Sequence, residues 1–212
     1  MGWAVARRLT AELLREGCDA LRTADANLAR LLDRNGMPPL RLRPAGFATL
    51  VHLILQQQVS LASAQAVYGR LESLLGEVSP GSFLKAEHDA LRGAGFSHQK
   101  IEYVTSMAAR IEDGQLPLDG LVHMSDDEAI EVLVAERGIG PWTASVYLLT
   151  ALGRPDVWAP GDRALLVSLG RMLATDDVPA NEDAVALAEK WRPWRSVAAR
   201  ILWHDYSAAE LR

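Results

Sequence analysis

Cysteine is nearly absent from this chain of 212 residues, since Cys18 is the only one. A single thiol excludes a disulfide within the chain and any zinc or iron–sulfur site built from four cysteines. It fits a reducing, cytoplasmic setting. Long apolar runs are also missing: no segment approaches the roughly 20 residues that cross a bilayer, and the first residues lack the apolar core of a signal peptide. We therefore expect a cytoplasmic protein without a membrane partner.

Basic residues are fewer than acidic ones. The chain has 22 Lys and Arg against 27 Asp and Glu, which gives a net charge of −5 at pH 7. This balance counts against a nucleic-acid partner, because proteins that bind DNA are usually basic. It does not exclude one, since affinity depends on the local field and neutral backbone amides also bind phosphate.

The alternation of apolar and polar residues that marks a half-buried strand is missing as well. Apolar residues make up 49% of the chain, with many Ala and Leu, which favours an all-α fold. The length suits one domain, or two small lobes that share a core. Ser79-Pro80-Gly81 is expected to form a turn. Caps, glycines and prolines predict helices near residues 10–22, 25–34, 47–57, 61–75, 87–92, 97–113, 125–137, 141–152, 163–173, 181–191 and 194–208.

The most informative segment is 137–144, which reads Arg-Gly-Ile-Gly-Pro-Trp-Thr-Ala. It separates two expected helices, so residues 125–153 are predicted to form helix, short hairpin, helix. Glycine at positions 138 and 140 permits positive φ and a close approach of another backbone, and Ile139 can anchor the turn. The amides at the start of the second helix would then favour a phosphate. Taken alone, the pattern equally describes a tight turn between two helices with no ligand.

Four segments in order resemble the helix-hairpin-helix superfamily of DNA glycosylases, and most of all its alkylpurine (3-methyladenine glycosylase II) branch. Residues 47–60 are similar to the helix and loop that carry the residue wedged into DNA, and 133–144 to the hairpin. Residues 156–162, Asp-Val-Trp-Ala-Pro-Gly-Asp, are similar to the catalytic loop. Residues 191–203, with Trp-x-Pro-Trp-Arg-Ser at their start, are similar to the C-terminal signature. The resemblance spans about residues 25–206.

This resemblance implies a two-lobed, all-α glycosylase domain over residues 1–212, without the N-terminal β-rich lobe of some longer relatives. It assigns catalysis to Asp162, which follows Gly140 by 22 positions. A carboxylate fixed beside the sugar would stabilise an oxocarbenium-like transition state and orient the attacking water. Asp162 also suits the N-cap of the next helix, and the two roles are compatible. Asp156 is a weaker candidate that could simply shape a turn.

Trp142 determines the expected subclass. Bifunctional relatives carry a lysine at this point of the hairpin, which forms a Schiff base with the sugar, so tryptophan here implies hydrolysis without strand cleavage. The resemblance also places Trp142 and Trp203 in an aromatic pocket that suits an electron-poor, alkylated purine. Four residues past the hairpin tryptophan the family can place a pocket tyrosine. This chain has Val146 there, with Tyr147 beside it as the pocket candidate.

A flipped nucleotide leaves a gap in the base stack that a side chain must fill. Gln58 matches the wedge position and Gln57 precedes it, although three glutamines in a row could equally be a polar helix end. The DNA backbone is expected to bind at the hairpin, through Gly138, Ile139, Gly140 and Thr143. Further candidates for phosphate contacts, with solvated helix-end charges as the plain alternative, are Lys100, Arg137 and Arg195. Trp191 and Trp194 are interpreted as core residues.

The resemblance therefore predicts a monomer that excises alkylated purines, of the 3-methyladenine and 7-methylguanine type, from duplex DNA in base excision repair. Its expected location is cytoplasmic and nucleoid-associated. We expect no cofactor and no metal held by side chains, because the five histidines lack metal-ligand spacing; a monovalent cation could bind at the hairpin carbonyls. One alternative is a catalytically silent helix-hairpin-helix protein that binds DNA, which would not need Asp162. Another is a helical protein-interaction domain, which leaves the co-occurrence of the segments unexplained.

Overall fold

The computed structural model describes residues 8–175 and 177–210, and within these ranges every regular element is helical. The all-α prediction is therefore confirmed. The first seven residues, for which the sequence predicts no signal peptide, lie outside the described part. Among the described residues, no helix combines the length and the apolar character that a membrane span needs.

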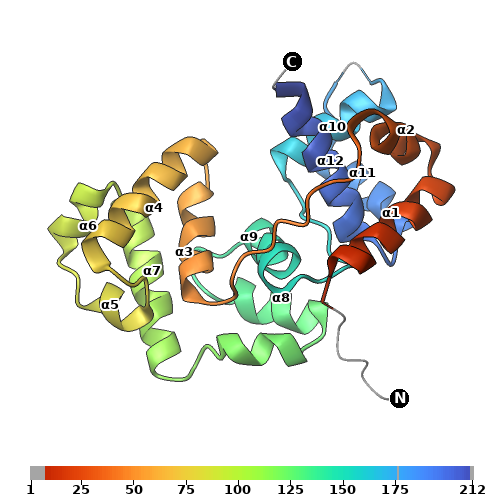
Figure 1. The fold of residues 1–212 in the computed structure, drawn as a ribbon. Coiled ribbons are helices and arrows are strands. Elements are labelled where there is room, and N and C mark those ends of the chain that lie inside the picture. Colours follow the sequence, from red (N-terminus) through yellow and green to blue (C-terminus); the bar gives the residue numbers. More distant parts are fainter. Residues whose placement is uncertain (1–7, 176, 211–212) are drawn as a thin grey trace. The chain divides into compact units, whose positions relative to one another are not determined.

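Contacts group the chain into two compact units, which Figure 1 shows with their helices labelled. The first unit combines the N-terminal segment up to Leu42 with the chain from Leu148 onward. The second unit is the continuous stretch Arg43–Tyr147. Two lobes were expected, and the structure adds that one of them is built from both ends of the chain.

The continuous unit is built around α3 (Phe47–Gln56), whose apolar side chains Phe47, Leu50, Val51, Ile54 and Leu55 are buried as predicted. Helix α3 packs against α4, α7 and α9. The unit contains α3, α4 (Leu61–Leu75), α5 (Pro80–Leu84), α6 (His88–Ala94), α7 (His98–Glu112), a 3₁₀ segment (Leu118–His123), α8 (Asp126–Val134) and α9 (Pro141–Tyr147).

The discontinuous unit is centred on α12, which packs against α1, α2 and α10. Its C-terminal helix therefore lies between elements from the two ends of the sequence (Figure 1). The unit contains α1 (Ala11–Ala24), α2 (Ala26–Asn35), a π-helical segment (Leu148–Leu152), α10 (Arg163–Leu173), α11 (Asn181–Ala188), a 3₁₀ turn (Glu189–Trp191) and α12 (Arg195–Glu210).

Local capping signals explain where the helices begin. Asp25, Ser60 and Ser97 accept hydrogen bonds from backbone amides in the first turns of α2, α4 and α7, as the sequence predicts. Ser125 and Glu128 form the expected reciprocal capping box of α8. These bonds act within one helical turn, so neighbouring residues are enough to predict them.

The prediction of a turn at Ser79-Pro80-Gly81 is wrong, because Pro80 and Gly81 belong to the short helix α5. Ser79 caps a short helix instead: its side chain accepts from the Ser82 amide, and the Ser82 hydroxyl accepts in return from the Ser79 amide. Pro80 occupies the first helical position, where its missing N–H costs nothing. Serine at the third position performs the role that glutamate or glutamine usually has in a capping box, so the sequence pattern does not indicate this helix.

Candidate active site

Asp162 lies at the point where the loop after Gly153 enters α10. Gly161 immediately before it has φ +72°, a conformation that side chains disfavour. The Asp162 carboxylate oxygen Oδ1 accepts a hydrogen bond from the Leu165 amide at 3.0 Å and another from the Trp203 indole Nε1 at 3.0 Å. The residue is 8% exposed. The N-cap role is confirmed, and the side chain is held in one orientation from two sides.

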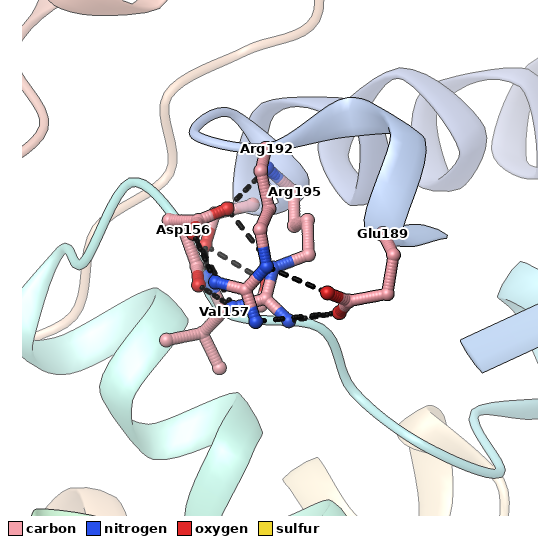
Figure 2. A network of polar contacts seen from close by, with 6 residues as sticks. Asp156, Val157, Glu189, Arg192 and Arg195 are labelled. Carbon is pink, nitrogen blue, oxygen red and sulfur yellow. Dashed lines mark hydrogen bonds and ion pairs between the residues drawn. The ribbon is translucent and has the colours of Figure 1, made fainter. Parts of the chain in front are cut away.

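The base of this loop is held by a polar network in the discontinuous unit (Figure 2). Asp156 Oδ1 accepts from Arg195 Nε at 2.9 Å, and Asp156 Oδ2 accepts from Arg192 Nη1 at 2.8 Å. Both arginines also contact Glu189. Asp156 is thus neutralised by two guanidinium groups and shapes the loop. Arg195 is committed to the same network, so the structure supports neither a catalytic role for Asp156 nor a phosphate contact for Arg195.

The main chain of the loop is also hydrogen-bonded to Ser196 of α12. The Ser196 hydroxyl accepts from the Val157 amide at 2.9 Å and donates to the Val157 carbonyl at 3.0 Å. The Ser196 amide donates to the Pro155 carbonyl at 3.0 Å. These bonds fix residues 155–157 against the start of α12. Trp203 lies two turns further along the same helix. One helix thus supports both the loop and a partner of its carboxylate.

A buried arginine that the sequence analysis did not single out supports this unit. Arg200 is 4% exposed, and its guanidinium donates to the carbonyl of Leu40, and to that of Leu149 at 2.9 Å. Burial lowers the pKa of Arg200 to about 10, which still leaves it charged at neutral pH. The side chain links the segment after α2 to the π-helical turn. Nothing local in the sequence distinguishes it from a surface arginine.

The hairpin lies in the other unit, between α8 and α9. Gly138 has φ +89°, and a Cβ there would lie 2.3 Å from Cδ2 of the Tyr103 ring. Glycine is therefore required for two independent reasons. Gly140 differs from the expectation: its φ is not positive, and an added Cβ would meet nothing within 4 Å. Ile139 is 3% exposed, which confirms it as the apolar anchor of the turn.

The wedge candidates, Gln57 and Gln58, occupy different environments. Gln57 Nε2 donates to the Gly138 carbonyl and to Thr143 Oγ1, both at 2.9 Å. Gln58 is exposed and has φ +61°. The Thr143 side chain is buried and its hydroxyl is used by Gln57, so any DNA contact by Thr143 would come from its main chain. Of the two glutamines, Gln58 has the side chain that is presented to solvent.

The three aromatic pocket candidates also differ. Trp142 and Trp203 are partly exposed, each on its own unit. Tyr147 is 0% exposed, and its hydroxyl oxygen accepts a hydrogen bond from the Gly46 amide at 2.8 Å; burial raises its pKa. The expectation that Tyr147 lines a base pocket is therefore corrected: it is a core residue that holds the start of α3. Trp191, 1% exposed, is core as predicted.

With this geometry established, comparison with known proteins identifies the family. The model of the HhH-GPD superfamily base excision DNA repair proteins matches residues 51–193. The chain belongs to this family. The match takes in the Gln57–Gln58 loop, the hairpin and Asp162, whereas Trp203 lies beyond it. Membership of the HhH-GPD superfamily confirms the resemblance on which the sequence prediction rests.

Individual relatives agree with the family. The DNA-3-methyladenine glycosidase of Bacillus halodurans has 30% sequence identity, a TM-score of 0.79, and a match covering 92% of this chain and 91% of that one. The 3-methyladenine DNA glycosylase Mag1 of Schizosaccharomyces pombe, solved in complex with abasic DNA, has 25% identity and a TM-score of 0.79, with 89% and 95% covered. YfjP of Bacillus subtilis is 30% identical over 187 residues, 84% of this chain. The chain spans only 65% of the length of YfjP.

Proposed function

We propose that this HhH-GPD protein hydrolyses the N-glycosidic bond of alkylated purines, of the 3-methyladenine and 7-methylguanine type, in duplex DNA. The observation that carries the proposal is the position of Asp162: it is a buried N-cap carboxylate bonded to Trp203, in the loop that resembles the family's catalytic loop and within the residues that the family model matches. Two similar proteins, from Bacillus halodurans and Schizosaccharomyces pombe, are named for 3-methyladenine. An alkylated purine is already a good leaving group, so a fixed negative charge beside the sugar is the main requirement.

In this mechanism Asp162 acts on the sugar and the water. Its carboxylate stabilises the positive charge that develops on the sugar ring as the base departs, and it orients the attacking water. The bonds from Leu165 and Trp203 hold the carboxylate without having to be rearranged during the reaction. Trp142 and Trp203 each have a partly exposed ring on their own unit, and a ring of this kind suits stacking with an electron-poor base.

The hairpin offers no amine for a lyase reaction. Trp142 stands where bifunctional relatives carry a lysine. Lys100 donates to the main-chain carbonyls of Leu55 and Gln57. A Schiff base needs a lysine amine that reaches the sugar. The proposed enzyme is therefore monofunctional and leaves an abasic site without breaking the strand.

The proposed partner is duplex DNA, bound by a monomer through the hairpin backbone in a cytoplasmic, nucleoid-associated setting. No group of three or more His, Cys, Asp or Glu in the described part of the chain could hold a metal ion. The hairpin cation stays a prediction: it would be held by backbone carbonyls, and one of them, Gly138 O, already accepts from Gln57.

Replacement of Asp162 by asparagine tests the function. The amide of Asp162→Asn keeps an oxygen that can cap α10 and accept from Trp203, so the fold should be retained while the charge is lost. We expect release of methylated purines from randomly methylated duplex DNA to fall by about 10²-fold or more. The released bases would be separated and quantified, with strand breaks measured before and after alkali.

Asp183→Asn is the matched control, because it removes an exposed carboxylate from α11 of the same unit. It should excise at the parental rate. If the folded parent binds this DNA and releases no base, the catalytic proposal is wrong, and the silent DNA-binding protein becomes the better interpretation. Strand breaks before alkali would instead contradict the monofunctional assignment.

A further inference from the structure

Helix α7 holds the two segments of the continuous unit that are proposed to meet DNA. Three of its side chains, spaced by three and seven residues, lie on one face of the helix. Lys100 bonds to the loop after α3, and the Tyr103 ring lies against Gly138. Arg110 Nε donates to the 3%-exposed carboxylate of Glu136 at 2.9 Å. One helix face therefore contacts the wedge loop (residues 57–60) and, at Glu136 and Gly138, the first part of the turn that forms the hairpin.

Lys100 fixes the main chain at the start of the wedge loop. Its ammonium donates to the carbonyl of Leu55 at 2.9 Å and to that of Gln57 at 3.0 Å. These are carbonyls at the C-terminal end of α3, where helical partners run out and the helix dipole favours a cation. Burial lowers the pKa of Lys100, and it has no carboxylate partner among the described residues. The hydrogen bonds of the ammonium thus go to main-chain carbonyls at the start of the wedge loop.

Gln57 is also held through its own side chain. Its amide nitrogen donates to the Gly138 carbonyl and to Thr143 Oγ1, both at 2.9 Å. The first acceptor belongs to the hairpin turn and the second to the first turn of α9. Main chain and side chain of one residue are therefore fixed by two different elements, which leaves the loop little freedom relative to the hairpin.

Gln58 comes next and is the residue that these bonds orient. Its φ of +61° is uncommon for a residue with a side chain, and such a conformation persists when the surrounding structure holds it. The side chain is exposed and forms no hydrogen bond with any residue in the described ranges. Gln58 thus combines a fixed main chain with a side chain that is available to another molecule.

We propose that Lys100 is a positioning residue for base flipping. It keeps the wedge loop at a fixed place relative to the hairpin, so that Gln58 enters the base stack when the hairpin binds the phosphates. The inference rests on the proposed function, since it concerns the wedge of that same site. Without the ammonium, two carbonyls lose their donor, and the loop must be ordered at the cost of DNA-binding energy.

Lys100→Met tests this proposal, because methionine keeps the apolar stem and removes the donor. We expect excision from a fully paired duplex to fall by about tenfold or more. Excision of the same lesion from an unpaired bubble should fall less than about threefold, because an unpaired base needs little help to leave the stack. Lys100→Arg should restore most of the paired-duplex rate. Lys85→Met, an exposed lysine of the same unit, is the matched control and should match the parent.

A second measurement does not depend on catalysis. With 2-aminopurine placed opposite a stable abasic analogue, entry of the wedge should unstack the reporter and raise its fluorescence. The parent and Lys85→Met should show this rise, and Lys100→Met should lose most of it. If the parent shows the rise without excising any base, the proposed activity fails while the positioning role stands.

In these two assays, three outcomes would overturn the inference. One is a parent that gives no fluorescence rise. Another is Lys100→Met behaving like the parent in both assays. The third is an equal loss on paired and unpaired lesions, which would identify a phosphate contact. If Lys100→Met does not fold, Gln57→Leu, which removes the two bonds to the hairpin side, should show the same selective loss on paired DNA. A Gln57→Leu protein that flips normally would equally overturn the proposal.

Discussion

At the scale of single residues, a bond between an indole and a capping carboxylate occurs twice among the described residues of the discontinuous unit. Trp203 Nε1 donates to Asp162, the N-cap of α10, and Trp191 Nε1 donates to Asp25, the N-cap of α2, at 2.9 Å. The geometry by itself therefore stabilises helix starts and does not identify a catalytic group. The two carboxylates differ in their place in the family: Asp162 lies within the residues that the family model matches, in the loop that resembles the catalytic loop, whereas Asp25 lies outside them. The Trp191–Asp25 bond can therefore serve as a control for the Trp203–Asp162 bond within the same protein.

We predict that Trp203→Phe lowers kcat while the protein stays folded. An aromatic ring is retained but the donor to Asp162 is lost, and a hydrogen bond to a charged group contributes about 1.5–3 kcal/mol. That corresponds to about tenfold or more in rate. Trp191→Phe should instead lower the free energy of unfolding and leave kcat unchanged. Single-turnover kinetics and urea unfolding of both variants make the comparison; equal kcat in the parent and Trp203→Phe would remove Trp203 from the positioning of Asp162.

At the scale of elements, the hairpin shows why two similar glycines are not equivalent. Gly138 has positive φ and lies against Tyr103, whereas Gly140 has neither constraint. The sequence pattern treats them alike, because it records the absence of a side chain at both positions. Only Gly138 is approached by a side chain from α7, so only there does the packing of another helix require glycine.

We predict that Gly138→Ala destabilises the protein by about 2 kcal/mol or more, because the added methyl group meets both a strained φ and the Tyr103 ring. Gly140→Ala, the matched control, should change the free energy of unfolding by much less. Denaturant unfolding measures both. Because Gln57 also bonds to Gly138, the first variant should weaken DNA binding as well. Similar unfolding free energies for the two variants would show that the contact with Tyr103 does not constrain the hairpin.

At the scale of the whole molecule, the net charge of −5 is unusual for a protein that is proposed to bind DNA. Two of the three sequence candidates for phosphate contact are used within the protein: Lys100 by carbonyls and Arg195 by Asp156. The third, Arg137, is paired with Glu102 at 3.5 Å and lies over the Tyr103 ring. Binding through hairpin amides is consistent with the use of these three cations in contacts within the protein.

We therefore predict a shallow salt dependence of DNA binding. Each phosphate neutralised by a cationic side chain adds about 0.9 to the slope of log K against log salt. Few such contacts should give a slope of about −3 or shallower. Fluorescence anisotropy of an abasic duplex between low and moderate salt measures it. A steep slope, like that of a strongly basic protein, would point to a basic DNA-binding surface formed by residues other than Lys100, Arg137 and Arg195.

The sequence by itself determined the helical class, most helix limits, the capping residues and the family-typical positions of Asp162 and the hairpin. These features follow from interactions within one helical turn or from contiguous motifs. Only the tertiary structure decided that Trp203 meets Asp162 across 41 residues, that Gln57 bonds to Gly138 across 81, and that Lys100 holds Leu55 across 45. It also showed that Tyr147 is buried in the core and that Asp156 belongs to an ion-pair network. Such contacts depend on how distant helices pack, and no local residue preference specifies them.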